Sequence, residues 1–398
     1  MEAWVGRESA TFRLPPSRLA LDPADVIRLA HDGREVEFRL TSIADAEARG
    51  IEAMRQDREA YDLPPGAARP AMLAAPVVWG APEVVMLDLP QLSEDQPAHR
   101  PLIAAQANPW PGTLAVFRSA SSDGFQLNTT FGTRAWIGTL VADLWPGPTS
   151  RFDLGNEVIV DLWTGTLESV TDIALFGGAN ALAVESAAGV WEILQVGAAE
   201  LIASGRYRLT RLLRGQRGTE AAMGNPAPAG ARVVVLDNAL AALPIGLADL
   251  NLPWNWRVGP AARAVTDESY AALAFTPGGR GLLPLAPVHV AQPWRQGRAP
   301  GDLTFRWTRR SRSLEADAWE QVEVPLGEDS ESWEVEIRDG AAVKRTLTAA
   351  TASVLYTAAD QTADWGAPLG PGDTLALRIF QLSTRLGRGT PAEVTLHF

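Results

Sequence analysis

The sequence lacks cysteine altogether and contains one lysine and four histidines in 398 residues. Without cysteine, neither a disulfide framework nor a thiolate-ligated metal site can form. No apolar run approaches the roughly 20 residues that a spanning helix needs, and Met1 is followed by charged residues instead of a signal-peptide core. We therefore expect cytoplasmic synthesis and no membrane span. We expect the chain to begin inside a fold, and we interpret it as a recombinant excerpt or a processed portion of a larger protein.

Arginine accounts for 34 of the 35 basic residues, and Lys344 is the one lysine. Together with the abundant alanine, this bias indicates genome composition and not phosphate recognition. The formal net charge of −12 disfavours binding to nucleic acid or to an anionic membrane. We expect no nucleic-acid partner.

Turn-forming residues are plentiful, with 35 glycines and 29 prolines scattered between short apolar runs. Hydrophobic residues make up 46% of the chain and charged residues 21%, as in folded globular proteins. A prior of about 100–200 residues per domain gives two to four domains. These features predict a mainly β protein with several β-barrel or β-sandwich domains in series.

The expected domains cover residues 1–65, 77–280 and 288–398. In the first, the alternation over 36–40 predicts a half-buried strand after the turn signal Asp32-Gly33. Residues 44–60 fit either a helix by composition or a strand by alternation. A Pro/Ala/Gly-rich connection over 62–76 follows this domain.

The second expected domain, 77–280, is a series of short apolar runs separated by turn signals, and it is rich in predicted strands. Within it, the run 198–203 is compatible with one or two helical turns. Residues 276–287 have the composition of a linker. In the last domain, Leu303, Phe305 and Trp307 alternate with polar residues, as expected of an immunoglobulin-like sandwich of about 100 residues.

The last domain resembles a fibronectin type III domain. The resemblance makes Trp307 the tryptophan of the B strand and Trp333 the start of the C strand. It also implies an F strand near 377–383, in which Phe380 replaces the tyrosine that usually forms the tyrosine corner. The fold expected for 288–398 is therefore a fibronectin type III-like sandwich.

The segment Tyr207–Glu220 resembles the Leu-Arg-Gly-x-Arg-Gly-Thr segment of phage tail proteins, above all the baseplate hub protein of gene transfer agents. The segment Leu19–Ile27 resembles the strand entry of a hub domain, with Ala24 where glycine usually stands. The resemblance implies a portion of a hub-like β domain at 1–65. Nothing corresponds to the glycoside-hydrolase-like barrel that lies upstream in that family, so its chemistry is not carried over.

The resemblance also implies a role and a location. The chain would connect the baseplate hub to tail fibres or host-contacting parts, with other tail and baseplate proteins as partners in a symmetric oligomeric assembly. It would be made in the bacterial cytoplasm and assembled into the tail tip of a phage-like particle.

The sequence gives only weak evidence for catalytic or metal-binding groups. The segment Arg214–Thr219 lacks the lysine of a phosphate loop and is interpreted as a glycine-dependent turn. Neither metal-ligand spacing nor a GxSxG nucleophile elbow occurs. Locally crowded carboxylates could serve glycosidic catalysis or a loose calcium site, but solvated loop charge is the preferred interpretation. We predict no catalytic residue, no metal, no cofactor and no enzymatic activity. The histidines considered are His31, His99, His289 and His397, and the carboxylates are Asp317, Glu320, Glu328, Asp329 and Glu331.

Tryptophan is unusually frequent, with 14 residues. Trp254, Trp256 and Trp294 lie near prolines in loop-like sequence and are the candidates for contact with a partner or a glycan. For Trp254 and Trp256, packing in the core is the preferred alternative, because most large aromatic side chains are buried. One alternative function follows from these candidates, a carbohydrate-binding module for host surface polysaccharide. A second alternative, an accessory region of a glycoside hydrolase, follows from the fibronectin type III resemblance, because such domains often follow bacterial glycanases. Four further tryptophans lie in strand-like runs and are expected in the core: Trp163, Trp191, Trp307 and Trp333.

Overall fold

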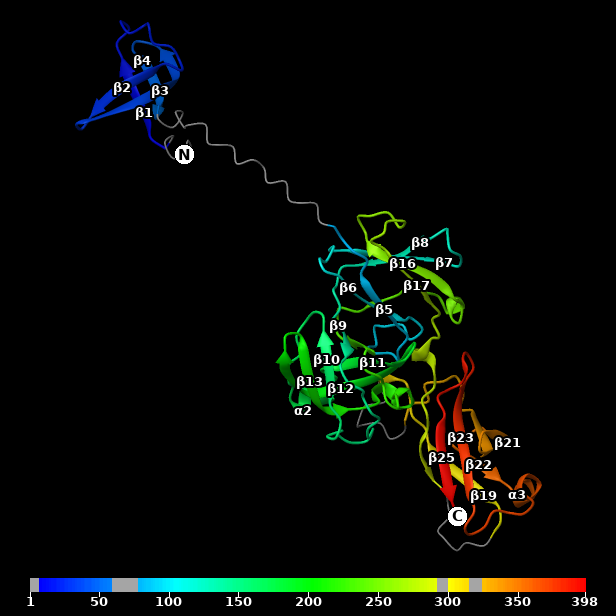
Figure 1. The fold of residues 1–398 in the computed structure, drawn as a ribbon. Coiled ribbons are helices and arrows are strands. Elements are labelled where there is room, and N and C mark those ends of the chain that lie inside the picture. The colour runs from blue at the N-terminus through cyan, green and yellow to red at the C-terminus, as the bar shows by residue number, and fades with distance from the viewer. Residues whose placement is uncertain (1–6, 59–77, 292–299, 315–323) are drawn as a thin grey trace. The chain divides into compact units, whose positions relative to one another are not determined.

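The computed structural model describes residues 7–58, 78–291, 300–314 and 324–398. The chain divides into two compact units, Met1–Pro76 and Val77–Phe398. Nearly all of its regular structure is β, in several sheets that follow one another along the chain (Figure 1). The predicted fold class, mainly β with barrels and sandwiches in series, is confirmed.

The first unit is a four-stranded antiparallel sheet with the order β1-β4-β3-β2. Its core is small and consists of Phe38, Leu40, Ile51 and Ala53. The open choice between helix and strand is decided for strand over 44–45 and 49–55, because the ladder that β4 forms with both β1 and β3 outweighs helix propensity. The strands are β1 (Ser9–Leu14), β2 (Val26–His31), β3 (Arg34–Asp45) and β4 (Arg49–Arg55).

Three residues of this unit have positive φ angles, as the sequence had indicated. Asp32 and Gly33 have φ values of 49° and 76°, as the two-residue turn between β2 and β3 requires. Ala24 has a φ of 81°, in the left-handed region that favours glycine. This angle accounts for the glycine that the hub resemblance places at that position.

The second unit contains a closed six-stranded barrel of order β10-β13-β12-β11-β14-β9 (Figure 1). Its core is mostly aliphatic and includes Val158, Val160 and Leu162. Residues 198–203 belong to β12 and pair with β13, so the expected helical turns are wrong: ladder hydrogen bonds outweigh the helix propensity of alanine, glutamate and leucine. The strands are β9 (Ile137–Leu140), β10 (Val158–Leu162), β11 (Ala181–Ala187), β12 (Val190–Ala203), β13 (Arg206–Leu213) and β14 (Arg232–Val235).

Two further sheets are built from segments on either side of the barrel in sequence, with orders β15-β6-β5 and β17-β16-β7-β8. Residues from β5, β6, β7 and β16 meet in one apolar core that includes Val116, Trp256 and Val258. The strands are β5 (Glu83–Leu87), β6 (Leu102–Gln106), β7 (Leu114–Ser119), β8 (Gln126–Phe131), β15 (Ala241–Ala242), β16 (Trp254–Pro260) and β17 (Ala271–Phe275).

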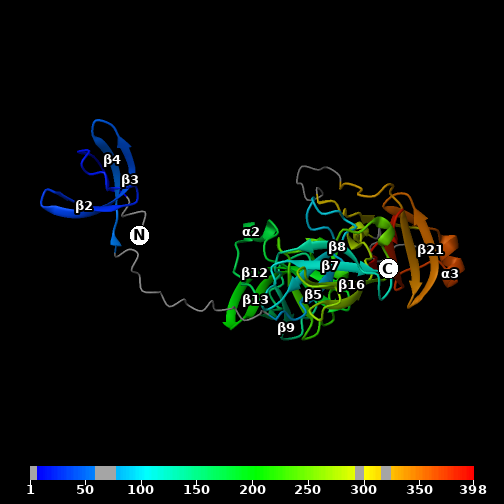
Figure 2. The ribbon, with the colours of Figure 1, turned by 90° about the horizontal axis from the view of Figure 1, so that it is seen from above.

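The C-terminal part is a sandwich of one sheet with the order β18-β19-β22 and a second sheet built on β20 and β23. The faces share one core, in which the rings of Trp307 and Trp333 meet edge to face with centroids 5.3 Å apart. Figure 2 shows helix α3 (Ala358–Trp365) near β21. The strands are β18 (Val288–Ala291), β19 (Leu303–Thr308), β20 (Trp333–Asp339), β21 (Ala342–Ala349), β22 (Ser353–Tyr356), β23 (Thr374–Ser383), β24 (Gly387–Arg388) and β25 (Ala392–His397).

Three of the four tryptophans expected in the core are buried: Trp191, Trp307 and Trp333. Trp163 is 43% exposed, so the expectation is wrong for this residue. It follows β10 directly, and the alternation that turns Val158, Val160 and Leu162 inward turns the next residue outward.

Helices are short throughout the described residues, and none of them has both the length and the apolar character needed to cross a membrane. Besides α3, the α-helical segments comprise the five-residue α2 (Asp172–Phe176), whose first turn is capped by the Thr171 hydroxyl.

Helix α3 is tied to the sandwich through Asp364. This carboxylate accepts two hydrogen bonds from Arg345 on β21, at 2.7 and 2.9 Å, and one from the Tyr356 hydroxyl at 2.8 Å.

Replacing Asp364 by Asn should make the stability of the sandwich less dependent on acid. Arg345 lowers the pKa of Asp364 below its usual value, so this carboxylate stabilises the fold above its unfolded pKa of about 3.9 and loses that contribution as pH falls through the folded pKa. We expect Asp364→Asn to cost about 1.5–3 kcal/mol near pH 7, and the difference from wild type to shrink below about pH 4. Urea unfolding followed across pH measures both.

The matched control is Asp339→Asn, because Asp339 is 59% exposed and lies 3.5 Å from the Lys344 ammonium. An exposed pair of this kind contributes about 0–1 kcal/mol. Equal losses at pH 7 in the two variants would contradict the role given to Asp364.

Candidate functional site

The loop Arg214–Glu220 leaves the barrel after β13 and consists of tight turns. It contains the 3₁₀ turn η2 (Gln216–Gly218) and ends at the first residue of the 3₁₀ turn η3 (Glu220–Ala222). A Cβ atom on Gly215 would lie 2.8 Å from the Cα of Glu220, and one on Gly218 would lie 2.4 Å from the side chain of Leu285. Both glycines also have positive φ values. The predicted glycine-dependent turn is confirmed.

Arg214 anchors this loop inside the barrel, where its side chain is fully buried. Its Nε and Nη2 donate to the two oxygens of Glu192 at 2.7 and 2.9 Å. Its Nη1 donates to Asp153 at 3.1 Å and to the carbonyl of Trp145 at 2.9 Å. Sequence reasoning missed this network, because Asp153, Glu192 and Arg214 are far apart in the chain and no local motif connects them.

The network keeps its charges despite burial. Burial by itself disfavours a charged Arg214, but Glu192 and Asp153 outweigh it and raise the pKa of the guanidinium. Burial likewise works against a charged Asp153, but hydrogen bonds from Asn156, Gly155 and Arg214 lower the pKa of this carboxyl overall. All three side chains are at most 3% exposed. The network is therefore a structural anchor with its hydrogen-bonding groups already engaged, and it offers no carboxylate to a substrate.

The same loop contacts the C-terminal sandwich through residues 284–286. The carboxylate of Glu220 pairs with Arg310, whose Nε donates to the carbonyl of Ala286 at 2.7 Å. The amide of Thr390 donates to the carbonyl of Pro284 at 2.9 Å. Barrel and sandwich are thus joined by direct contacts on both sides of one connecting segment, and we call this set of contacts the junction.

The connecting segment 276–287 is packed and is not a free linker as its composition had suggested. The carboxylate of Asp88 accepts hydrogen bonds from the amides of Gly278 and Arg280 at 2.7 and 2.9 Å. A Cβ on Gly281 would lie 2.3 Å from the carbonyl oxygen of Ala98. Glycine and proline here allow close backbone approach in addition to breaking secondary structure.

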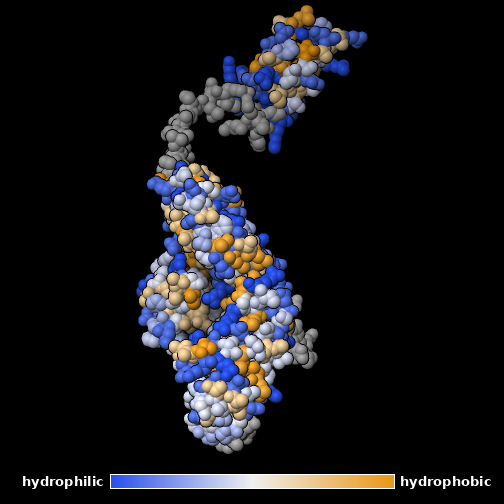
Figure 3. All heavy atoms as spheres, turned by 90° about the vertical axis from the view of Figure 1, so that its right-hand side faces the viewer, coloured by the Kyte–Doolittle hydropathy of each residue, from blue (hydrophilic) through white to orange (hydrophobic). Residues whose placement is uncertain are grey.

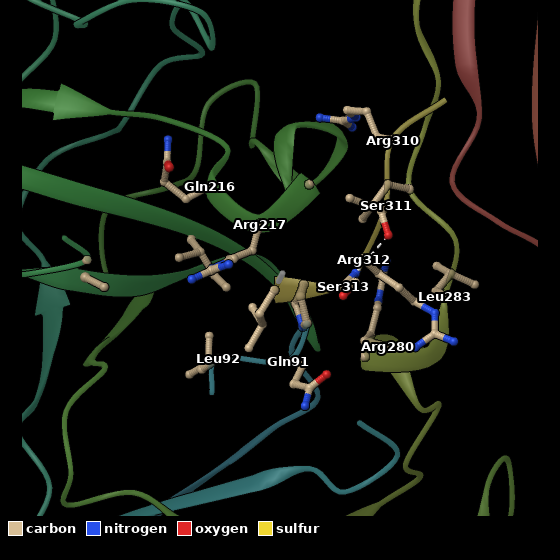
Figure 4. A pocket seen from close by; sticks show the side chains of 18 of the residues that line it. Gln91, Leu92, Gln216, Arg217, Arg280, Leu283, Arg310, Ser311, Arg312 and Ser313 are labelled. Atoms are coloured by element: carbon tan, nitrogen blue, oxygen red, sulfur yellow. Dashed lines mark hydrogen bonds between the residues drawn. The ribbon is translucent and has the colours of Figure 1, made fainter. Parts of the chain in front are cut away.

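A cavity of about 770 Å³ lies beside the junction, bordered by the barrel, the connecting segment and residues 308–314 (Figure 4). Its described lining contains no Asp or Glu. Apolar side chains, among them Leu92 and Leu283, form part of the wall. The basic lining residues are Arg217, Arg280, Arg309, Arg310 and Arg312.

Of the three tryptophans proposed as contact residues, the structure describes two, and these two differ in burial. Trp256 is 1% exposed and belongs to the core, so it is not a contact residue and the packing alternative holds: it lies in β16, not in a loop, and the pleat turns it inward. Trp254 is half-buried, with the Arg118 guanidinium 4.5 Å from its ring centroid. Trp294 lies outside the described residues. Partner or glycan contact by Trp254 and Trp294 stays a prediction.

The histidines and crowded carboxylates do not converge. Among the described residues, no group of three or more His, Asp or Glu side chains could hold a metal ion. The loop carboxylates are individually occupied, since Glu328 lies 2.8 Å from Arg312, Glu331 lies 3.2 Å from Arg309, and Asp329 accepts from the Thr384 hydroxyl.

Glu328 is only 6% exposed, so the interpretation as solvated loop charge is wrong for this residue, which is held by its arginine partner. Asp317 and Glu320 lie outside the described residues. The histidines are dispersed, as exemplified by His99, whose Nε2 lies 3.0 Å from the carbonyl oxygen of Ile245.

Comparison with known proteins gives two family matches. Residues 135–234, which include the barrel and the Arg214 network, match a family described as Rcc01698-like, C-terminal. Residues 1–43 match a family described as putative phage tail protein. The fold consists of β domains that follow one another along the chain. The two matches support a phage-tail-type protein with a structural role. A search of curated proteins finds no match.

Among solved structures, domains d3–d4 of the rat CD45 extracellular region align with 41% of this chain and 72% of that chain. The sequence identity is 8% and the TM-score is 0.20. This similarity is too low to carry an argument about fold or function.

Replacing Arg214 by Met should strongly destabilise the second unit, because Glu192 and Asp153 would remain buried without their counter-ion. Breaking a buried pair in this way costs about 3–5 kcal/mol. Urea unfolding followed by tryptophan fluorescence measures it, since every tryptophan except Trp4 lies in Val77–Phe398. The control is Arg208→Met on β13, the strand that leads to Arg214, where the side chain is 42% exposed and its ion pairs contribute about 0–1 kcal/mol. Equal effects of the two variants would count against the anchor.

Truncating Trp256 to Ala should destabilise the same unit by about 3–5 kcal/mol, the usual cost of removing a large buried aromatic side chain. Trp254→Ala should cost less, because Trp254 is only half-buried and less apolar area is returned to water. Urea midpoints of the two variants, compared with wild type, test the order. A larger loss for Trp254→Ala would show that Trp256 is not the core residue of the pair.

Proposed function

We propose that this chain is a non-enzymatic part of a phage-like tail baseplate that connects the hub to tail fibres or to other host-contacting parts. In this proposal it corresponds to the C-terminal portion of a hub protein of the gene transfer agent type. The observation that carries the proposal is the junction, in which the Arg214–Glu220 loop of the barrel engages residues 284–286 and Arg310. The loop lies within the segment that matches the Rcc01698-like family.

The junction supports a connecting role because it couples neighbouring domains through several direct contacts. Glu220 and Arg310 are each about one quarter exposed, and partial shielding from water strengthens their attraction. The Thr390–Pro284 hydrogen bond and the contact of Leu285 with Gly218 add further constraints. Several short-range contacts of different kinds oppose both sliding and rotation between barrel and sandwich. A component that holds a fibre in a fixed direction needs this resistance.

The proposed domains are a hub-like portion at 1–65, a tail-protein domain at 77–280 and a fibronectin type III-like domain at 288–398. The match of residues 1–43 to a phage tail family supports the first. The paired tryptophans in the core of the last sandwich support the third. Phe380 is buried at the position where the resemblance expects tyrosine, so this domain would lack the tyrosine-corner hydrogen bond.

The proposed partners are other tail proteins and tail fibres in a symmetric assembly within the particle. On the face shown in Figure 3, hydrophobic residues form small groups interrupted by hydrophilic ones. Mixed surfaces of this kind are usual at interfaces between separately folded proteins. Exposed strand edges, such as the outer side of β21, provide a second way of docking.

The alternative of a carbohydrate-binding module has less support, because Trp256 is buried and leaves Trp254 without the neighbouring platform that was expected. The accessory role beside a glycoside hydrolase rests on domain type alone. A glycan array separates these alternatives from the proposal: saturable sugar binding that Trp254→Ala abolishes would favour the binding module.

Removing the C-terminal sandwich should leave tails assembled but without fibres. We expect particles in which the chain ends after Pro287, and so keeps the packed connecting segment, to form tails with at least a tenfold loss of fibre occupancy or host adsorption. Electron micrographs and adsorption assays measure the two. Full-length particles carrying Arg378→Ala, which removes an exposed ion pair with Glu393, serve as control. Full fibre occupancy and adsorption in the truncated particles would contradict the connecting role.

A further inference from the structure

The cavity beside the junction is unusual because it concentrates positive charge in an acidic protein. The whole chain has a formal net charge of −12. The described lining of the cavity nevertheless holds five arginines and neither Asp nor Glu. Charge of one sign in a concave site raises the local concentration of ligands of the opposite sign.

Among the described residues, three of these five arginines are held in ion pairs and two are not. Arg309, Arg310 and Arg312 are paired with Glu331, Glu220 and Glu328, respectively. In the part of the chain that the structure describes, Arg217 and Arg280 have no carboxylate within ion-pair distance, and both are exposed. Asp88, which attracts Arg280 at longer range, already accepts two backbone amides.

The position of Arg217 is fixed by the loop that carries it. Its φ is 57°, a left-handed angle that costs a non-glycine residue about 1 kcal/mol or more. The loop is anchored at one end by buried Arg214 and at the other by the Glu220–Arg310 pair. The cavity thus contains a cation held in place by the fold and not one on a free surface chain (Figure 4).

The wall also offers apolar surface next to the arginines. Leu92 and Leu283 line the cavity near Arg217 and Arg280 (Figure 4). Phe176, which also lines it, is 69% exposed, and Ile173 on the same short helix is 86% exposed. Large apolar side chains left in water beside a charged pocket are typical of surfaces that a partner covers.

We propose that this cavity binds an acidic peptide segment of another tail protein. Carboxylates of that segment would pair with Arg217 and Arg280, and a Leu or Phe side chain would pack on Leu92, Leu283 and Phe176. The inference rests on the proposed tail function and names one partner chemistry for it. Two arginines on separate loops suit successive carboxylates, because guanidinium groups bind carboxylates through paired hydrogen bonds.

A peptide fits the cavity better than a free anion or a sugar. The volume of about 770 Å³ lies within the range of pockets for medium-sized ligands and far exceeds that of an inorganic anion. Sugars present hydroxyl donors together with apolar ring faces, and the described lining provides neither a carboxylate acceptor nor a tryptophan. Separate carboxylate and apolar contacts are what an alternating acidic and hydrophobic peptide supplies.

The first test is fluorescence anisotropy with the purified chain and a labelled nonapeptide that alternates Asp or Glu with Leu and Phe. A second nonapeptide has Asn and Gln in place of the acidic residues. We expect the acidic peptide to bind at least tenfold more tightly than the neutral one. The double variant Arg217→Gln/Arg280→Gln should weaken acidic-peptide binding at least tenfold, with weaker salt dependence. Arg306→Gln, an exposed arginine outside the cavity, should change binding less than twofold.

An unchanged urea midpoint in the double variant will show that the loss of binding does not reflect unfolding. Equal affinity for acidic and neutral peptides, or unchanged affinity in the double variant, would overturn the inference. Binding of oligogalacturonate but not of the acidic peptide would overturn it as well, in favour of an anionic glycan.

The second test uses purified particles that carry the double variant. If the variant chain is incorporated while one other tail protein is lost, the inference is supported. If the variant chain is incorporated and every tail protein is retained, the docking inference fails and the tail role stands. Absence of even the wild-type chain from purified particles would instead refute the proposed tail function, whatever the peptide experiment shows.

Discussion

The buried pairing of Arg214 with Glu192 and Asp153 is the constraint on which the barrel and its surroundings depend. An unpaired charge in a protein interior is so costly that all three groups must lie together or the region cannot fold as it does. Glu192 also accepts the amide of Gly215 at 3.2 Å, so the network fixes the first residue of the loop as well as its arginine. The positions of Arg217, Gly218 and Glu220 follow from that anchor.

The junction and the cavity are consequences of this one loop. Gly218 leaves room for the side chain of Leu285, Glu220 pairs with Arg310, and Arg217 lines the cavity. Neighbouring residues of the loop therefore take part both in the junction and in the proposed peptide site. Arginine suits both tasks because its planar group makes several directed hydrogen bonds at once. The arginine bias first attributed to genome composition therefore also has structural use, as the two-pronged pair of Arg232 with Glu185 shows on the barrel surface.

Local patterns predicted local structure well where one face of a strand is buried. The alternation at 303–307 gave the correct strand and inward face, and the glycines after Arg214 gave the correct turn. The same reasoning did not give the strand at 198–203, the close packing of 276–287 or the burial of Trp256. In each case the outcome was decided by a distant partner: the β13 ladder, the carboxylate of Asp88 and the core shared by β7 and β16.

The sequence by itself determined the β class, the positions of many strands, and the absence of disulfides, because side-chain alternation, turn residues and cysteine content are local or compositional properties. Only the tertiary structure decided that Arg214 meets Glu192 and Asp153, that the connecting segment is packed, and that five arginines line one cavity. These features join residues 22 to more than 200 positions apart. Such encounters depend on barrel closure and domain packing, which no local pattern encodes.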